Sequence, residues 1–296
     1  MSCRSQQSIS SSIIVLNFAT KLINMSFDTL NSLVNLECYP IHDLGGRGAR
    51  LLEKVRTCME VDALCCLPHF IKPSALRRMV QEILTCQEKA YPIESQRTAY
   101  SWIDRTQYPL DHAVNITSEH RLASVTRDSM GDASALVSLF HCNELTEFVR
   151  ECFGIRALYR VTCPFLSLNV KIMDQGARHG WHFDNNDGAV SLLLQEAKQG
   201  GEYEYVPYLR SDKNENYGGV RSVLRGDRSN VRIVAIRAGT LCLFRGGRSL
   251  HRVRHIIEGS PDRLTAILSY SDQPNHFYNE NTLRTVLGQL PTRSVS

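Results

Sequence analysis

The stretch RHGWHFDNNDG, residues 178–188, gathers imidazole and carboxylate side chains that could bind a metal ion. His182 and Asp184 are two residues apart, so in a β-strand their side chains share one face. Two imidazoles and one carboxylate on one face of an octahedron suit Fe(II) and leave three positions open for co-substrate and dioxygen. The pair alone is weak evidence, because a polar turn could have the same sequence. A second histidine from another strand would complete the site.

Two histidines further along the chain are candidates for the third ligand. His251 follows the Gly-Gly turn at residues 246–247, and Arg263 comes twelve residues later, at the start of the next expected strand. An arginine there can bind a carboxylate bidentately, and Thr265, two residues on and on the same face, can support it by hydrogen bonding. The interval from His255 to Arg263 is only eight residues, which leaves little strand before the turn. We therefore predict His251 as the ligand.

The elements that must position these residues are short strands. From about residue 157 the chain alternates apolar runs with Gly-rich or Asp/Asn-rich turns. Seven such runs without intervening helices predict an antiparallel sandwich or barrel. A polar segment, residues 209–230, interrupts the series and is expected to be a surface insertion or lid. The expected strands are 157–173, 188–195, 201–209, 231–239, 240–247, 250–257 and 263–271.

The N-terminal half of the chain has a different pattern, in which most of the expected elements are helices. Apolar residues at helical spacing predict four helices, and a buried strand is expected over 63–71. Residues 92–125 are polar and are expected to be irregular. The fold class is therefore α+β, a jelly-roll core with flanking N-terminal helices. The predicted helices are 48–59, 72–91, 132–140 and 144–154.

Composition excludes several classes of protein. The chain has 296 residues, 43% of them hydrophobic, which is ample for a core. The net charge of +4, without a block of Lys or Arg, argues against a nucleic-acid partner. No apolar run approaches the roughly eighteen residues of a membrane helix. Ten cysteines without a CxxC motif indicate an intracellular, cytoplasmic protein. Residues 1–27 are expected to be a disordered leader before a possible second start at Met25, or, less favoured, a transit peptide.

Two longer stretches carry a resemblance to a known family: GWHFDNNDGAVSLLLQEAKQGGEYEYVP and, downstream, GTLCLFRGGRSLHRV. Together with the residues above they resemble the Fe(II)/2-oxoglutarate-dependent oxygenases, and in particular the carrier-independent halogenases and hydroxylases of free amino acids. The resemblance implies a double-stranded β-helix (cupin-like) domain over residues 126–275. An N-terminal helical part over 28–125 would pack on it, and 276–296 would form a C-terminal tail. It also implies His182, Asp184 and His251 as the metal ligands.

The resemblance extends to residues around the expected ligands. Arg263 would pair with the distal carboxylate of 2-oxoglutarate, and Asn169 matches an asparagine near that co-substrate. His179 and Asn185 match positions that line the amino-acid pocket. Lysine-specific relatives have an acid where this chain has Asn185, which argues against lysine as the substrate. Halogenating members have a small residue in place of Asp184, so the chain resembles the hydroxylating branch.

The predicted function is hydroxylation of an unactivated carbon of a free amino acid or similar small polar metabolite. Fe(II) is the metal, 2-oxoglutarate and O2 are co-substrates, and succinate and CO2 are released; ascorbate is expected to support activity. Desaturation, a peptide or larger metabolite as substrate, and a non-catalytic jelly-roll binding module remain alternatives. Nucleic-acid demethylation is disfavoured by the mild charge. The sequence does not predict the oligomeric state.

Overall fold

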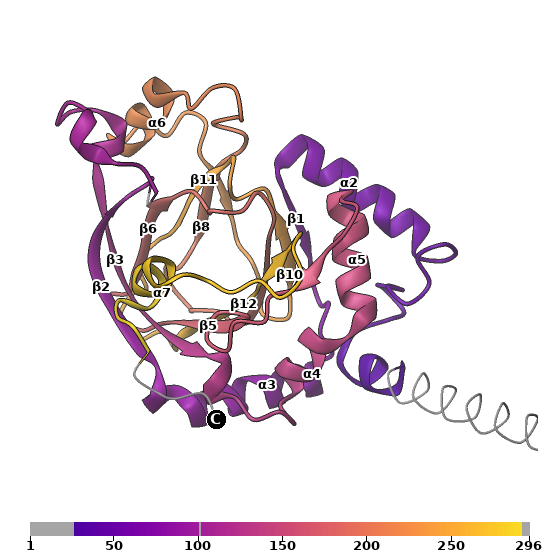
Figure 1. Cartoon of the computed structure of the whole chain (residues 1–296). Coiled ribbons are helices and arrows are strands. Elements are labelled where there is room, and N and C mark those ends of the chain that lie inside the picture. The colour runs from indigo at the N-terminus through magenta and orange to yellow at the C-terminus, as the bar shows by residue number, and fades with distance from the viewer. Residues whose placement is uncertain (1–26, 101, 292–296) are drawn as a thin grey trace, which may run out of the picture.

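The computed structural model of the chain describes residues 27–100 and 102–291, so all but the last residue of the expected leader lie outside the described residues. Residues 27–33 are helical. The described chain is organised around one large sheet that curls into an open barrel, with helices on its outside (Figure 1).

That sheet has eleven strands, paired antiparallel throughout, in the order β1-β10-β7-β12-β5-β3-β6-β11-β8-β9, with β2 paired to β3. A curled antiparallel sheet of this kind, with helices outside, confirms the predicted α+β fold with a jelly-roll core. Two further short strands, β4 and β13, pair with each other. The strands are β1 (Leu64–Leu67), β2 (Tyr91–Thr98), β3 (Thr117–Thr126), β4 (Tyr159–Arg160), β5 (Leu168–Met173), β6 (Arg178–His182), β7 (Ala189–Gln195), β8 (Tyr203–Val206), β9 (Arg232–Val234), β10 (Leu241–Phe244), β11 (Leu250–Val253), β12 (Arg263–Leu268) and β13 (Tyr270–Ser271).

Alternation along the strands separates a core face from a cavity face. In β12, Leu264, Ala266 and Leu268 are buried in the main hydrophobic cluster under the helices. The residues that alternate with them, Arg263, Thr265 and Ile267, line the cavity inside the curl. The period of two therefore fixes which side chains reach the interior of the barrel.

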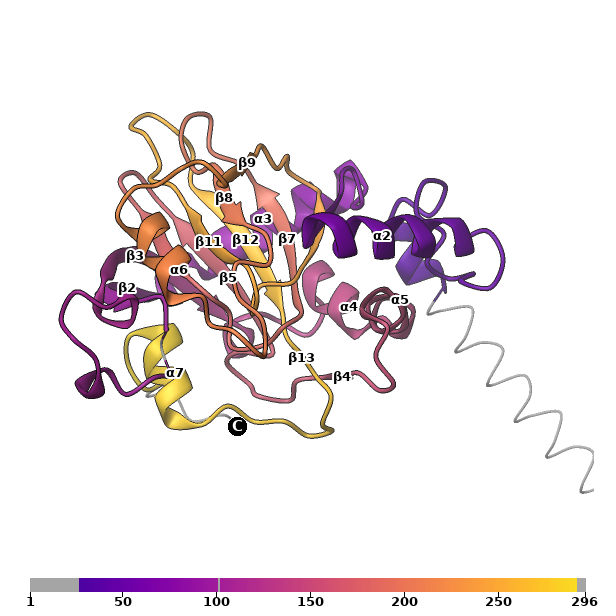
Figure 2. The same ribbon diagram turned by 90° about the horizontal axis from the view of Figure 1, so that it is seen from above.

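Four helices cover the outer face of the sheet and supply the other half of that cluster. The four helices predicted from apolar spacing are found here with similar bounds. Gly154 ends the last of them in a left-handed conformation (φ 65°), as expected of a glycine after a helix. In Figure 2 this helical layer lies to one side of the barrel. The helices are α2 (Ala49–Asp62), α3 (Pro73–Cys86), α4 (Ala135–His141) and α5 (Asn143–Phe153).

Two segments differ from the sequence-based expectation. Residues 92–125 were expected to be irregular, but β2 and most of β3 occupy this segment and extend the sheet. Their inward and outward residues alternate less regularly in polarity than those of the later strands, which hid the pattern. The expected C-terminal tail contains a helix, α7 (Glu280–Leu287), capped by the side chain of Asn279.

The polar segment 209–230 contains α6 (Tyr217–Leu224), which packs its buried Val220 and Val223 into a separate apolar cluster with Tyr100 and Trp181. None of its residues lines the cavity. Within the described parts of the chain, no helix is long and apolar enough to cross a membrane.

Candidate metal centre

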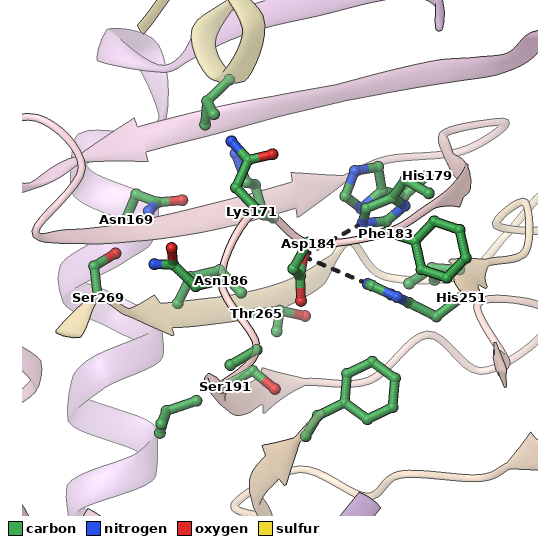
Figure 3. Close-up of a pocket in the computed structure, with 18 of the residues that line it drawn as sticks. Asn169, Lys171, His179, Phe183, Asp184, Asn186, Ser191, His251, Thr265 and Ser269 are labelled. Atoms are coloured by element: carbon green, nitrogen blue, oxygen red, sulfur yellow. Dashed lines mark ion pairs between the residues drawn. The ribbon is translucent and has the colours of Figure 1, made fainter. Parts of the chain in front are cut away.

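The HxD pair and the downstream histidine lie side by side on two paired strands. His182 ends β6, and its cross-strand partner is His251 in β11. Their ring centroids are 4.1 Å apart. Asp184 follows β6 and turns its carboxylate toward both rings: Oδ1 lies 3.9 Å from Nε2 of His182 and 3.6 Å from Nε2 of His251 (Figure 3). The predicted trio therefore forms one cluster, with all three ligand atoms within 4.8 Å of one another.

Backbone carbonyls fix the orientation of both imidazoles. Nδ1 of His182 lies 2.7 Å from the carbonyl oxygen of Gly180, and Nδ1 of His251 lies 3.0 Å from that of Ser249. When each Nδ1–H donates to its carbonyl, the lone pair of Nε2 points at the cluster, as metal-binding histidines require. Burial lowers the pKa of His182 to about 3 and that of His251 to about 4. Both rings are thus neutral near pH 7.

A glycine gives Asp184 its position. An added Cβ at Gly246 would lie 1.8 Å from Oδ2 of Asp184, so a side chain there would displace the carboxylate. The carbonyl of Gly246 also accepts a hydrogen bond from the backbone N–H of Asp184 (3.1 Å). The Gly-Gly turn before β11 is therefore needed for close packing against the cluster.

The donor set fits a divalent transition-metal ion. Two bonds of about 2.1 Å can bridge ligand atoms up to roughly 4.2 Å apart, and both histidine–carboxylate distances fall within that limit. All three residues line the cavity, so a metal ion held by them would face it. Two imidazoles and one carboxylate in this arrangement are the set that suits non-haem Fe(II).

Arg263 lies deep in the same cavity, 6% exposed, and donates a hydrogen bond from Nη1 to Oγ1 of Thr265. No described carboxylate forms an ion pair with it. Burial lowers its pKa to about 10, so it remains charged at neutral pH. A buried guanidinium with free donors and a supporting hydroxyl is suited to a carboxylate ligand.

The cavity that contains these groups has a volume of about 320 Å³. The remaining predicted site residues also line it. Asn169 projects from β5, and its Oδ1 atom is buried without a hydrogen-bond partner among the described residues. His179 lies against His182 with the two rings tilted by 34° and their centroids 4.1 Å apart. Asn185 follows Asp184 in the cavity wall. Every residue that the sequence predicted for the site therefore lines one cavity. Figure 3 labels five of them: Asn169, His179, Asp184, His251 and Thr265.

The second candidate histidine, His255, and the next acid of the motif, Asp187, lie elsewhere. His255 lines a separate groove with Trp181 and Arg252. Asp187 is held by Arg245 (2.9 Å) and Arg248 (3.1 Å). The geometry thus favours His251 and Asp184 over these two residues.

Several cavity residues were missed by the sequence analysis. They are Arg97 on β2, His120 on β3, Lys171 on β5 and a group on or before α7. Lys171 could have been found, because it is two residues from Asn169 and therefore on the same face of the strand. The other elements are remote in sequence from the motif, so no local pattern points to them. The α7 group is Tyr278, Thr282, Thr285 and Val286.

Comparison with protein families identifies the chain. The family model described as Halogenase D matches residues 75–286, which includes almost the whole sheet and every cavity residue named above. The chain belongs to the Halogenase D family. No curated protein matches it in sequence at a significant level.

Solved structures show the same fold at low sequence identity. The α-ketoglutarate-dependent epimerase SnoN from nogalamycin biosynthesis has a TM-score of 0.54 and 14% identity, covering 84% of this chain and 92% of its own. AviO1 from Streptomyces viridochromogenes has a TM-score of 0.51 and 16% identity, and the match covers 75% of this chain and 95% of AviO1. The α-ketoglutarate-dependent carbocyclase SnoK has a TM-score of 0.51 and 14% identity, and the match covers 74% of this chain and 83% of SnoK.

Family membership and the three-residue cluster confirm the predicted superfamily, an enzyme, and its cofactors Fe(II) and 2-oxoglutarate. The hydroxylating branch and the free amino-acid substrate are not decided by these likenesses. They depend on the chemistry of the cavity.

Proposed function

We propose that this Halogenase D family member is a hydroxylase of a small free metabolite of the amino-acid type, acting in the cytoplasm. His182, Asp184 and His251 hold Fe(II), and Arg263 with Thr265 holds the distal carboxylate of 2-oxoglutarate. The observation that carries the choice of reaction is Asp184. Its carboxylate lies within 3.9 Å of both histidine nitrogens and would occupy the metal position that a halide needs.

When bound, Fe(II) with 2-oxoglutarate and dioxygen supplies the oxidising power that breaks an unactivated C–H bond. The chain's own residues position the reactants. Arg263 and Thr265 would fix one end of the co-substrate, and Asn169, on the adjacent strand β5, would donate to it from its side-chain Nδ2. The apolar walls, among them Phe183 and Phe244, keep water away from the metal.

The size and position of the cavity support a small substrate. A volume of about 320 Å³ is at the lower end of ligand pockets, which span roughly 300–1,000 Å³, and the co-substrate must share it. Residues of α7 line the same cavity, and this helix lies across the opening of the barrel (Figure 1). An extended peptide would have to displace it.

The test is a panel of free amino acids and small carboxylic acids, each incubated with protein, Fe(II), 2-oxoglutarate and ascorbate. We expect iron-dependent succinate release with at least one compound, and a product heavier by one oxygen atom. A product lighter by two hydrogen atoms would assign desaturation instead. Failure to decarboxylate 2-oxoglutarate with every compound, by protein that binds iron, would overturn the proposal.

A further inference from the structure

One guanidinium outside the cavity contacts both chain segments that supply the metal ligands. It belongs to Arg210, at the start of the polar segment 209–230, and only 12% of its side chain is exposed. None of the residues 209–230, all of which the structure describes, lines the cavity. The metal site described above does not use Arg210, so its burial and its contacts need another explanation.

The first contact is with the segment that contains His182 and Asp184. Phe183 stands between these two ligands, lines the cavity and is 3% exposed. The guanidinium carbon of Arg210 lies over its ring, 4.2 Å from the centroid. A cation at this distance from a buried ring is attracted to its face. Because Phe183 shares its backbone with both neighbours, a fixed ring restrains the residues on either side of it.

The second contact is with the turn at residues 246–249, here called the ligand turn. Its carbonyl groups orient two of the ligands. That of Gly246 accepts a hydrogen bond from the backbone N–H of Asp184 (3.1 Å), and that of Ser249 lies 3.0 Å from Nδ1 of His251. A shift of the ligand turn would therefore move both ligands at once.

Arg210 holds the ligand turn at two points. Its Nε atom donates to the carbonyl of Gly247 (2.6 Å), and its backbone N–H donates to that of Arg248 (3.1 Å). Nη1 donates to the carboxylate of Glu215 (3.1 Å), which balances the charge of the guanidinium. A planar guanidinium can stack on a ring while it donates hydrogen bonds in its own plane, and a lysine ammonium cannot do both.

We propose that Arg210 is a positioning residue of the metal site. It joins Phe183 to the ligand turn, and so keeps the two imidazoles and the carboxylate at the spacing that binds Fe(II). This deepens the proposed function and rests on its ligand set. Residues that orient metal ligands without touching the metal typically change metal affinity by about 10- to 100-fold when they are replaced. The polar segment thereby supports the iron site from outside the cavity.

Arg210→Met tests this inference, because the variant keeps an apolar stem against Phe183 and loses every side-chain hydrogen bond. The dissociation constant of Fe(II) is measured without oxygen, by competition with a chromogenic chelator. We expect it to rise at least about tenfold. The increase in Tm on addition of Fe(II) should shrink accordingly, which separates metal affinity from the stability of the metal-free protein. Arg210→Lys keeps the charge but not the planar contact, and should also bind iron more weakly than the parent.

Arg228→Met is the matched control. Arg228 belongs to the same polar segment, lies over the ring of Trp181 (5.4 Å) and pairs with Glu204 (3.1 Å). Arg252 also contacts both of these partners, so they stay in place and the control should bind iron as the parent does. Parent-like iron affinity in Arg210→Met, or in Arg210→Lys if the first variant does not fold, would overturn the inference. An equal loss of affinity in Arg228→Met would also overturn it, and a parent protein that binds no Fe(II) would overturn the proposed function itself.

Discussion

The two ends of the cavity are built in different ways. The metal end comes from two adjacent strands, β6 and β11, whose register places His182 opposite His251. The opposite wall is assembled from β2, β5 and α7, which are far apart in the sequence. At the metal end the two imidazoles and the carboxylate of Asp184 point at one cluster. The opposite wall instead has Arg97 and Lys171, which form no ion pair with an acid of the described residues, and hydroxyl groups on and just before α7.

This difference predicts which end of the cavity can change without loss of the metal site. A metal site that depends on strand register and backbone carbonyls tolerates little change, since each histidine is held by its own main chain. A wall made of side chains from three unconnected elements can change its charge without disturbing the metal. We infer that the metal end determines the reaction and the opposite wall determines the substrate.

The largest expected effect is loss of the metal end. His251→Ala, or His182→Ala, should abolish iron binding and turnover together, because two ligands cannot hold a labile divalent ion well. His255→Ala is the matched control, since His255 lies in a separate groove and should bind iron as the parent does. Iron content and succinate release measure both outcomes. Near-normal succinate release by either ligand variant would exclude that histidine from the metal site.

Asp184→Gly tests whether the carboxylate of Asp184 is a metal ligand and whether it determines the type of reaction. Removal of the carboxylate leaves a vacant metal position large enough for chloride, so hydroxylation should collapse and iron binding should weaken. Added chloride should partly restore iron binding or alter the optical spectrum of the metal. Hydroxylation at the parent rate, with unchanged iron affinity, would show that Asp184 is not a ligand.

Substitutions at the residues expected to bind 2-oxoglutarate should weaken co-substrate binding without loss of iron. For Arg263→Ala we expect a cost of about 2–5 kcal/mol in 2-oxoglutarate binding, with iron affinity retained, since a buried charge pair is lost. Thr265→Val should cost less, about 0.5–1.5 kcal/mol, because it removes one supporting hydrogen bond. Titration of succinate release against 2-oxoglutarate measures both. An unchanged requirement in Arg263→Ala would assign the carboxylate to another cation.

Loosening α7 should affect only the opposite wall. Leu287 is fully buried in a small cluster with Tyr91 and Leu166, and it anchors the helix. Leu287→Ala should destabilise this contact by about 2–5 kcal/mol and raise KM for the primary substrate, with iron and 2-oxoglutarate binding unchanged. Arg284→Ala, at an exposed position of the same helix, is the control. If KM is unchanged although hydrogen exchange shows a looser α7, the helix does not close the cavity.

The smallest effect expected is on pH dependence. The pKa of Lys171, lowered by burial to about 7, leaves it charged below pH 7 and neutral above. The groups that face it do not titrate there: Arg97 and Arg263 stay charged, and burial lowers the pKa of His120 to about 2 and that of His179 well below its usual value. Because Lys171 is the cross-strand partner of Thr265, the KM for 2-oxoglutarate should therefore rise as the pH rises above 7, and Lys171→Arg should remove this rise. A rise that persists in that variant would have another origin.

The sequence predicted the metal end well because its information is local. An HxD pair, a Gly-Gly turn and an Arg-x-Thr pair on the next strand each fix a side chain through strand periodicity. The chemistry of the opposite wall could not be predicted in the same way. Arg97 lies in a segment that was expected to be irregular, and α7 in one expected to be a tail, so their place at the cavity depends on tertiary packing alone. Lys171 could have been predicted, because it lies two residues from Asn169 and therefore on the same face of the strand.

The atom that the enzyme transfers to its substrate tests most directly whether Asp184 occupies a metal position. The parent protein is incubated with Fe(II), 2-oxoglutarate, the substrate that the panel identifies, isotopically labelled dioxygen and excess chloride, and the mass of the product is measured. With Asp184 on the metal, we expect a product that carries one labelled oxygen and no chlorine. A chlorinated product from the parent protein would contradict the account, because it would require a halide at the position assigned to Asp184.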